Sequence, residues 1–528
     1  MGRLQKKIEI MDTTLRDGEQ TSGVSFLPSE KLQIAKLLLE ELKVDRIEVA
    51  SARVSDGELA GVKKITQWAR TKGYLDKVEV LGFVDTPRSV DWIIEAGAKV
   101  MNLLTKGSLN HLVHQLKKTP EQHFEEIGKC IEFAHSKGIE VNVYLEDWSN
   151  GMRNSLDYTL DLLNFLSGKR IKRIMLPDTL GLLQPNEVRE FLSLITQKYP
   201  SQHFDFHAHN DYDLSIANVL EAVKNGAQGI HTTVNGLGER AGNAPLESVV
   251  AVISDFTDLK LSVQENKIYR ISKLIEQFSG LHIPSNKPVV GENVFTQTAG
   301  IHADGDNKKN LYFSDLLPER FGRTRKYALG KTSGKANILK NLMELGISLE
   351  PDELNKVTQR IIELGDRKER VTTEDLPYII SDVLQNNSIN MDILIDGYHM
   401  VHSKGLKPSV QLRMKIYDKF YEENASGDGQ YDSFMKALKK IYKSLKKELP
   451  KLTDFHVSIP PGGKTDAFVE CIITWDYGKI FKTKGLDSDQ TIAAMMATEK
   501  MLNIIEQLNK TNLENKNPYG NEYSAIAG

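Results

Sequence analysis

Two histidines, His207 and His209, stand two residues apart at the end of an alternating run and could bind one metal ion. The run 204–206 (Phe-Asp-Phe) is typical of a β-strand, in which residues two apart point to the same face. A carboxylate that could join them is Asp17, near the other end of the same series of repeats. Two histidines and a carboxylate suit a divalent cation that keeps open positions for substrate. The pattern His-x-His alone would fit a pair of surface histidines equally well. The presence of Asp17 as a third potential ligand favours the metal site.

The elements that would position these residues are eight short β-rich runs, separated by amphipathic helical patterns such as Glu30–Leu42 and Glu121–His135. The expected strands are Ile8–Met11, Arg46–Ala50, Val78–Val84, Lys99–Leu104, Ile139–Leu145, Ile171–Leu176, His203–His207 and Gly229–Val234. Eight strand–helix units before residue 275 predict the α/β fold of a (β/α)8 TIM barrel. A doubly wound open sheet is the alternative, but no Gly-x-Gly-x-x-Gly follows the first strand.

Polar residues lie within or just after every expected strand. They are Arg16, Asp17, Glu48, Asp85, Asn102, Thr105, Glu146, Asp147, Asp178, Thr179, His207, His209 and Asn235. One acidic residue after a strand is often only a helix cap. A polar group at each strand end indicates a shared site, because the carboxyl ends of barrel strands carry the active site.

Beyond the barrel the pattern changes twice. Residues 280–385 combine helices with irregular, Gly-rich stretches, and the region around Asn386 is expected to be a linker. After it, strands followed by a helix occur two times over. These strands are expected at Val410–Ile416, Phe455–Ile459 and Phe468–Trp475, and the helices at Phe434–Leu445 and Ile492–Ile505. We therefore expect a catalytic barrel (1–279), helical linking subdomains (280–385) and a C-terminal α+β regulatory or dimerisation domain (386–528).

Composition narrows the class of protein. The chain has 528 residues, 40% of them hydrophobic and 26% charged, as in an ordinary globular protein of more than one domain. A net charge of -3 gives no reason to expect nucleic acid or an anionic membrane as partner. Only Cys130 and Cys471 are present, which excludes a disulfide framework. No apolar signal region opens the sequence, so we expect a cytoplasmic protein.

Four motifs identify a family resemblance. They begin at Asp12 (Asp-Thr-Thr-Leu-Arg-Asp-Gly-Glu-Gln), Leu176 (Leu-Pro-Asp-Thr-Leu-Gly), His207 (His-Ala-His-Asn-Asp) and Asn235 (Asn-Gly-Leu-Gly-Glu-Arg-Ala-Gly-Asn). In this order they resemble the α-isopropylmalate, homocitrate and citramalate synthase family. Residues 295–305 resemble its linking subdomain and the tail resembles its allosteric domain, so the similarity covers nearly the whole chain. Within the family, residues 142–151 are most similar to the citramalate-forming members.

The resemblance implies an acyltransferase. It would condense acetyl-CoA with pyruvate and water to (R)-citramalate and CoA, in isoleucine biosynthesis, and it would need a divalent metal such as Mn, Mg or Zn. It would be a homodimer with isoleucine as feedback inhibitor. A 2-isopropylmalate synthase, which takes 2-oxoisovalerate in leucine biosynthesis, is the main alternative. A retro-aldol acyl-CoA lyase is less favoured because no Cys stands in the Gly236–Gly242 loop, and an amino-acid sensor because no active-site residue is missing.

The same resemblance assigns roles to residues of this chain. The metal ligands would be Asp17, His207 and His209, with Asn243 as a weaker or outer ligand. Arg16 would stabilise the alkoxide formed at the ketone, although an Arg beside an Asp is more often an ion pair. Glu146 or His302 would be the general base. Further predicted substrate contacts are Leu81, Leu104 and Tyr144 around the side chain of the oxo acid, Thr179 at its carboxylate, and Asp304 and Tyr312 near His302.

Several of these residues have simpler roles open to them. The role of Thr179 could be merely to cap the next helix. Leu81 and Leu104 could be ordinary residues of the barrel core, and His302 could be an ordinary loop histidine. By resemblance, His302 would come from the linking subdomain of the partner subunit. The regulatory ligand would contact Tyr431, Leu452, Phe455, Ile459, Val469 and Gln490. Phe455, Val457 and Ile459 alternate on one strand face, so these positions could also be core.

Overall fold

The computed structural model describes residues 7–306, 308, 311–345, 347–366, 371–384, 392–458, 469–478 and 480–515. The chain divides into two compact units, one of residues 1–296 and 310–326, the other of residues 297–309 and 327–528. The chain passes between the units near two short strands, β9 (Thr296–Gln297) and β10 (Lys326–Tyr327). Among the described residues, no helix has the length and apolar character needed to cross a membrane.

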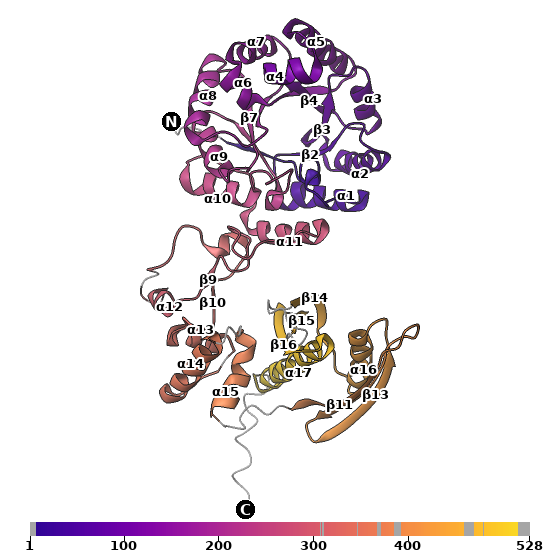
Figure 1. The fold of residues 1–528 in the computed structure, drawn as a ribbon, viewed down its shortest axis with the longest axis vertical. Helices are drawn as coiled ribbons and strands as arrows, with labels where there is room; N and C mark the ends of the chain where they lie inside the picture. The colour runs from indigo at the N-terminus through magenta and orange to yellow at the C-terminus, as the bar shows by residue number, and fades with distance from the viewer. Residues whose placement is uncertain are drawn as a thin grey trace, which may run out of the picture. The chain divides into compact units, whose positions relative to one another are not determined.

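The first unit is a closed barrel of eight parallel strands in sequence order (Figure 1). The strands are β1 (Glu9–Asp12), β2 (Arg46–Ser51), β3 (Val78–Phe83), β4 (Val100–Lys106), β5 (Glu140–Glu146), β6 (Ile174–Asp178), β7 (Phe204–Ala208) and β8 (Gly229–Thr232). The predicted TIM barrel is confirmed. All eight expected strands are present, and the largest shift is at β6, which begins at Ile174 rather than Ile171.

The first unit also contains helices, most of which surround the barrel (Figure 1). They are η1 (Gly18–Gln20), α1 (Pro28–Lys36), η2 (Leu37–Leu42), α2 (Asp56–Lys72), η3 (Leu75–Lys77), α3 (Arg88–Glu95), α4 (Leu109–His111), η4 (Leu112–Leu116), α5 (Pro120–Ser136), α6 (Trp148–Asn154), α7 (Leu156–Ser167), α8 (Pro185–Lys198), α9 (Ser215–Lys224), η5 (Val234–Gly236), α10 (Leu246–Phe256), η6 (Glu265–Lys267), α11 (Ile268–Ser279) and η7 (Pro318–Phe321). Their starts follow local chemistry. At α5, Thr119 and Gln122 form a capping box around Pro120, which satisfies backbone donors of the first turn.

The barrel strands and helices share one large apolar core, but polar groups fill part of the barrel interior. At the amino ends of the strands, Arg46 is buried among three carboxylates. Its guanidinium lies 3.1 Å from Glu9, 3.1 Å from Glu79 and 2.6 Å from Asp205. Since a buried charge needs partners of opposite sign, this cluster leaves Arg46 and Asp205 both ionised inside the barrel.

The second unit begins with helices: α12 (Gly300–Asp306), α13 (Lys335–Leu345), α14 (Pro351–Asp366), η8 (Thr373–Asp375) and α15 (Leu376–Leu384). Of these helices, α13, α14 and α15 contribute to a small apolar core of their own. The expected helical character of this region is therefore present. The linker expected around Asn386 lies outside the described residues.

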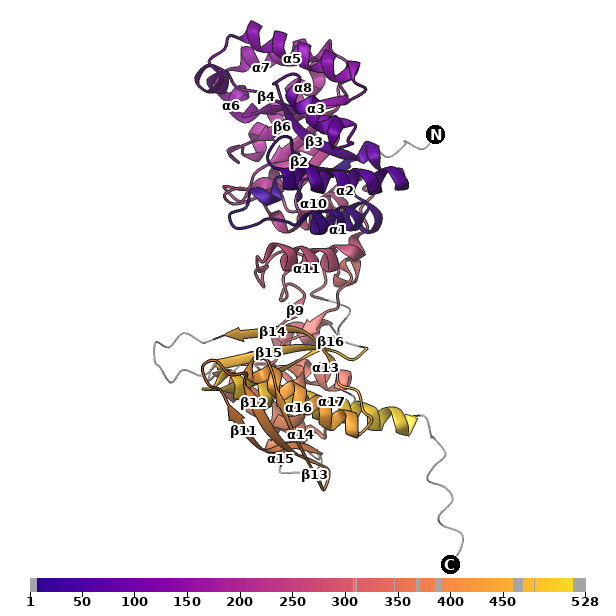
Figure 2. The same cartoon turned by 90° about the vertical axis from the view of Figure 1, so that its right-hand side faces the viewer.

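The tail contains two copies of a three-strand and one-helix pattern, as Figure 2 shows. The first copy is β11 (Ile393–Val401), β12 (Ser409–Ile416), β13 (Lys419–Ser426) and α16 (Gln430–Ser444). The second is β14 (Lys451–Ser458), β15 (Val469–Asp476), β16 (Ile480–Asp487) and α17 (Gln490–Asn515). Both sheets are antiparallel and both helices pack into one shared core. The predicted α+β repeat is confirmed, and β11, β13 and β16 are strands that the sequence reading does not predict.

Candidate active site and metal centre

Asp17, His207 and His209 come together at the carboxyl ends of β1 and β7. The Nε2 atom of His207 lies 3.2 Å from Asp17 Oδ2 and 3.3 Å from His209 Nε2. One potential ligand atom from each residue lies within 4.8 Å of the others, and all three side chains are buried. Among the described residues this is the one such group of three or more. The arrangement suits a divalent cation that keeps positions open for substrate.

The protonation states of Asp17 and His209 suit metal ligands. Burial opposes ionisation of Asp17, but Arg16 and the two histidines hold the pKa of Asp17 well below its usual range. Burial, together with repulsion from His207, lowers the pKa of His209 to about 4. His209 is therefore neutral at pH 7, and a neutral imidazole has the lone pair that a metal ligand needs.

Asn243, the predicted weaker ligand, lies beside His209, to which its backbone is bridged. Its amide nitrogen donates to a backbone carbonyl at 3.1 Å. Its Oδ1 atom is buried and has no hydrogen-bond partner among the described residues. An unpartnered buried oxygen next to a potential ligand fits an outer position at a cation site.

Arg16 is held beside this group by a fixed set of contacts. Its Nε donates to Glu48 Oε2 at 2.6 Å, its Nη1 lies 3.1 Å from Asp17 Oδ2, and its Nη2 donates to the Tyr144 hydroxyl at 3.4 Å. Asn102 donates to the other Glu48 oxygen at 2.7 Å. Burial opposes the charge on Arg16, but Glu48 and Asp17 raise its pKa above the usual value. The guanidinium is thus a permanent, oriented positive charge.

The predicted pocket wall forms a separate apolar cluster inside the barrel. Met11, Leu81, Tyr144 and Met175 are buried together, and Leu104 packs against them. The Tyr144 ring stands edge-on to His207, with ring centroids 6.1 Å apart and planes at 89°. The three predicted wall residues are therefore in one cluster, next to the potential metal ligands.

Glu146, a predicted base, ends β5 in register with Lys106 at the end of β4, and the two side chains form an ion pair. Thr179 accepts a hydrogen bond from the backbone amide of Asp147 at 2.9 Å, so its hydroxyl connects the loops after β5 and β6. Contact of Thr179 with the substrate carboxylate stays a prediction. Lys106 is absent from the sequence-based site because a strand-end lysine has no distinguishing pattern.

The other predicted base is in the second unit. His302 and Asp304 lie on α12, where Asp304 pairs with Lys308 at 2.6 Å. Tyr312 belongs to residues 310–326 of the barrel unit, and its side chain is exposed. A contribution of His302 to the site of a partner subunit therefore stays a prediction.

Two interior polar residues extend the network beyond what the sequence predicts. Asn142 donates to Asn102 Oδ1 at 2.9 Å, and His231 Nδ1 lies 3.0 Å from the Tyr144 hydroxyl oxygen. Met11 and Met175 of the apolar wall are also unforeseen. All four lie within or beside strand interiors, where a sequence pattern indicates only barrel core.

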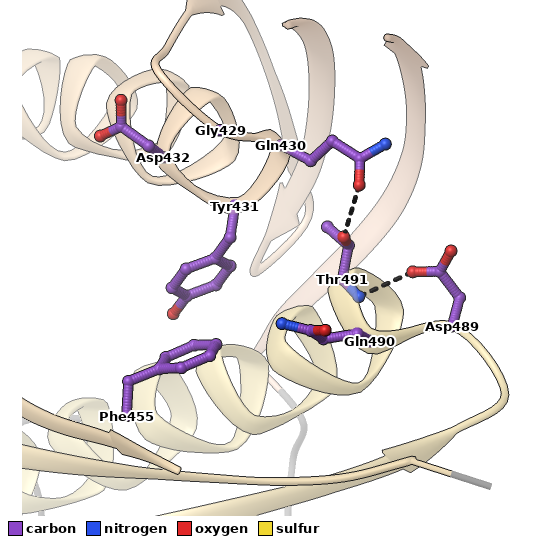
Figure 3. Close-up of a pocket in the computed structure, with 8 residues that line it drawn as sticks. All are labelled: Gly429, Gln430, Tyr431, Asp432, Phe455, Asp489, Gln490 and Thr491. Carbon is purple, nitrogen blue, oxygen red and sulfur yellow. Dashed lines mark hydrogen bonds between the residues drawn. The ribbon is translucent and has the colours of Figure 1, made fainter. Parts of the chain in front are cut away.

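The tail holds a cavity of about 400 Å³ between the starts of α16 and α17 (Figure 3). Its lining residues are Gly429, Gln430, Tyr431, Asp432, Phe455, Asp489, Gln490 and Thr491. Three predicted regulatory residues, Tyr431, Phe455 and Gln490, are thus brought to one pocket. Leu452 and Val469, on β14 and β15, are not among the lining residues, and Ile459 lies outside the described part of the chain.

Comparison with family models defines the class of protein. Residues 7–275 match the HMGL-like model, residues 289–369 match the homocitrate synthase post-HMGL domain-like model, and residues 370–506 match the LeuA allosteric (dimerisation) domain. The chain belongs to the HMGL-like family, and it is a transferase of the group that combines the catalytic barrel with a LeuA domain.

Individual proteins of this group are similar to the chain over most of its length. The (R)-citramalate synthase CimA of Methanocaldococcus jannaschii is 34% identical over 504 residues, covering 94% of this chain and 99% of that protein. The 2-isopropylmalate synthase of the same organism is 33% identical over 512 residues, covering 96% and 94%. A solved HMG-CoA lyase of Bacillus subtilis is 22% identical with a TM-score of 0.47, covering 53% of this chain and 96% of that one.

Proposed function

We propose that the chain condenses acetyl-CoA with pyruvate and water to give (R)-citramalate and CoA, with a divalent cation held by Asp17, His207 and His209. The observation that carries the choice of oxo acid is the Tyr144 ring, buried in the apolar cluster 6.1 Å from His207 between ring centroids. A ring in this position leaves little space beside the ligands for a side chain larger than methyl.

The reaction divides among residues of the site. A cation held by the three ligands would polarise the keto group of the bound 2-oxo acid. A base, Glu146 or His302, takes a proton from the acetyl methyl group, and the resulting carbanion forms a carbon–carbon bond to the keto carbon. Arg16 offers fixed positive charge to the alkoxide oxygen that develops. Protonation of this oxygen and hydrolysis of the thioester then release the product and CoA.

We propose that the phosphates of acetyl-CoA bind at the loop after β8. The Gly236–Gly242 segment borders a cavity of about 210 Å³ whose lining includes Arg240 and Lys287. Cationic side chains and a glycine-rich backbone suit the phosphates of CoA, since the backbone amides and ammonium groups both favour anions. Replacement of Lys287 by Ala should raise the KM for acetyl-CoA and leave that for pyruvate unchanged.

The first test is the choice of 2-oxo acid. Steady-state kcat/KM should be highest for pyruvate, and the preference over 2-oxobutanoate should be about tenfold to a hundredfold, because one methylene in an apolar pocket discriminates by ~1–3 kcal/mol. Rejection of 2-oxoisovalerate should be stronger, since a branched side chain would overpack against Tyr144. Thiol release from acetyl-CoA at saturation measures all three acids.

Smaller side chains in the wall of the 2-oxo acid pocket should weaken the preference for pyruvate. Tyr144→Ala and Leu81→Ala should lower kcat/KM for pyruvate and bring the larger acids closer to it. Leu103→Ala, in the main core of the same barrel, is the matched control for loss of packing alone. A wild-type protein that prefers 2-oxoisovalerate contradicts the proposal and makes the chain a 2-isopropylmalate synthase, the activity named for the second relative.

We further propose that the tail pocket binds isoleucine as feedback inhibitor in a homodimer, which the LeuA dimerisation domain supports. Tyr431 and Phe455 supply an apolar wall, with ring centroids 5.2 Å apart, and Tyr431 is anchored through a 2.7 Å bond to Thr498. The amino end of α16 borders the same cavity, where helix N–H groups favour a carboxylate. At the start of α17, Asp489 already accepts hydrogen bonds from the N–H groups of Thr491 and Ile492. The apolar wall and the amino end of α16 together suit a hydrophobic amino acid.

Loss of this wall should desensitise the enzyme. With Tyr431→Ala or Phe455→Ala, the isoleucine concentration for half-maximal inhibition should rise at least about tenfold, because a buried aromatic side chain contributes more than ~1.4 kcal/mol to binding. The uninhibited kcat should be unchanged. Tyr398→Ala, exposed on β11, is the matched control. Inhibition of the wild type by leucine rather than isoleucine would contradict the choice of effector.

A further inference from the structure

The wall residue Tyr144 belongs to a hydrogen-bonded chain of five side chains that crosses the barrel interior. Its hydroxyl oxygen lies 3.0 Å from His231 Nδ1, and the Nε2 of His231 lies 3.1 Å from Asp205 Oδ2. Asp205 in turn accepts from Arg46 at 2.6 Å. At the other end, Arg16 donates to the same Tyr144 hydroxyl at 3.4 Å. The chain thus connects the charged cluster at the amino ends of the strands to the reaction centre.

The direction of each bond follows from its partners. Asp205 pairs with Arg46 and is a carboxylate, so it can only accept, and His231 Nε2 must carry the hydrogen between them. In this tautomer the Nδ1 of the neutral ring is bare and accepts from the Tyr144 hydroxyl. The lone pairs of that hydroxyl are left for the donor Arg16. All of these contacts are satisfied at once in this arrangement.

The surroundings of His231 leave it no competing role. Its ring and the Asp205 carboxylate are both fully buried in the barrel. The ring packs edge-on against Tyr144 and against His207, with centroids 5.4 Å apart in both pairs. Its two nitrogens are both used in the chain, so it has no nitrogen left for a cation or a substrate.

We propose that His231 is a positioning residue for substrate choice: it holds the Tyr144 hydroxyl, and with it the ring, at the wall of the 2-oxo acid pocket and toward Arg16. This rests on the proposed function, since Tyr144 matters only where a 2-oxo acid binds. Without His231, the Tyr144 hydroxyl loses its acceptor in a buried place, and its ring turns or its hydroxyl reaches for the substrate carboxylate instead.

The test is a double-mutant cycle in the full-length protein. His231→Leu and Tyr144→Phe cut the same bond from its two sides, and Tyr144→Phe keeps the ring. Each should lower kcat/KM for pyruvate about five- to tenfold, mainly through KM, because a buried hydrogen bond is lost. Each should also reduce the ratio of kcat/KM for pyruvate to that for 2-oxobutanoate. The double variant should be no worse than either single one, since both remove one interaction.

Two further variants separate positioning from packing. His231→Gln keeps a donor and an acceptor, so it should recover part of the wild-type substrate ratio. His203→Leu removes a different histidine on Asp205, whose Nε2 lies 2.9 Å from Oδ1, but it does not reach Tyr144. It should leave both the ratio and KM unchanged. If His231→Leu does not fold, Tyr144→Phe and His231→Gln still give the substrate ratio.

Additive losses in the cycle with an unchanged pyruvate ratio would overturn the positioning role and leave His231 a packing residue. This outcome differs from failure of the proposed function, in which the wild type itself does not prefer pyruvate. In that case the same cycle is measured on the 2-oxo acid that the wild type does prefer. If His231 positions Tyr144, the effects of the two substitutions are still coupled. If the two residues act independently, the effects add.

Discussion

Replacing His207 or His209 with Ala is expected to lower kcat by a factor of about a thousand or more, because polarisation of the keto group by a cation is a main source of rate at such a site. The Asp17→Asn variant should behave in the same way. The three side chains offer ligand atoms within 4.8 Å of one another, so loss of one leaves a site with too few donors. Metal content by mass spectrometry should fall in parallel with kcat.

The design separates loss of metal from loss of fold. Far-UV circular dichroism and the melting temperature of the metal-free variants should stay close to those of the metal-free wild type, since the barrel core does not depend on these side chains. His203→Ala, directly before the same strand, is the matched control and should keep both metal and activity. Full activity of a chelator-treated His207→Ala/His209→Ala variant would exclude a role for these residues.

The barrel and the meeting of these ligands could be predicted because both depend on periodic patterns. Asp17 and His207 lie about 190 residues apart in sequence. Asp17 follows β1 and His207 lies near the end of β7, and these strands are separated only by β8 in the closed barrel. Closure places the carboxyl ends of all strands on one face, so residues at those ends meet without any local signal. Identifying the strands one by one in the sequence is therefore enough to predict that these potential metal ligands meet.

The three unforeseen tail strands lack the alternation that identifies a half-buried strand. No residue of β13 is buried, and Gly397 interrupts β11 where its register with β12 shifts. Such a bulge breaks the two-residue period. In β16, lysines and a glycine stand among few apolar residues. These strands form because β12 and β15 offer backbone partners, and pairing of this kind is not visible in one strand's own sequence.

The polar contacts inside the barrel are a second feature that could not be predicted from the sequence. His231 and Asn142 each lie in a strand whose pattern indicates core, and nothing in their spacing shows which polar partner they meet. Their partners, Tyr144 and Asn102, come from other strands, and the pairing depends on register and side-chain direction. The same applies to Lys106, whose partner Glu146 is across the β4–β5 pair.

Replacing Arg16 with Gln is expected to lower kcat about a hundred- to a thousandfold, since loss of one preorganised donor to a developing oxyanion has this effect in other enzymes. KM for pyruvate should change much less, because the charge matters most once the alkoxide forms. Metal content should be unchanged, which distinguishes this variant from those of the ligands. Arg16→Lys keeps the charge but not the fork that reaches Glu48, Asp17 and Tyr144 together, so it should be intermediate.

The contacts of Arg16 also show how this experiment could mislead. Glu48 is fully buried and would lose its cation, so Arg16→Gln can unfold the barrel for reasons unrelated to catalysis. The double variant Arg16→Gln/Glu48→Gln removes both charges and should fold while remaining slow. Arg153→Gln, which breaks a two-bond pair with Glu187 on the outer helices, is the matched control and should keep wild-type kcat. The role of Arg16 is contradicted if the double variant folds, binds metal and keeps kcat within about threefold of wild type. Loss of a preorganised donor to the alkoxide should cost far more than this.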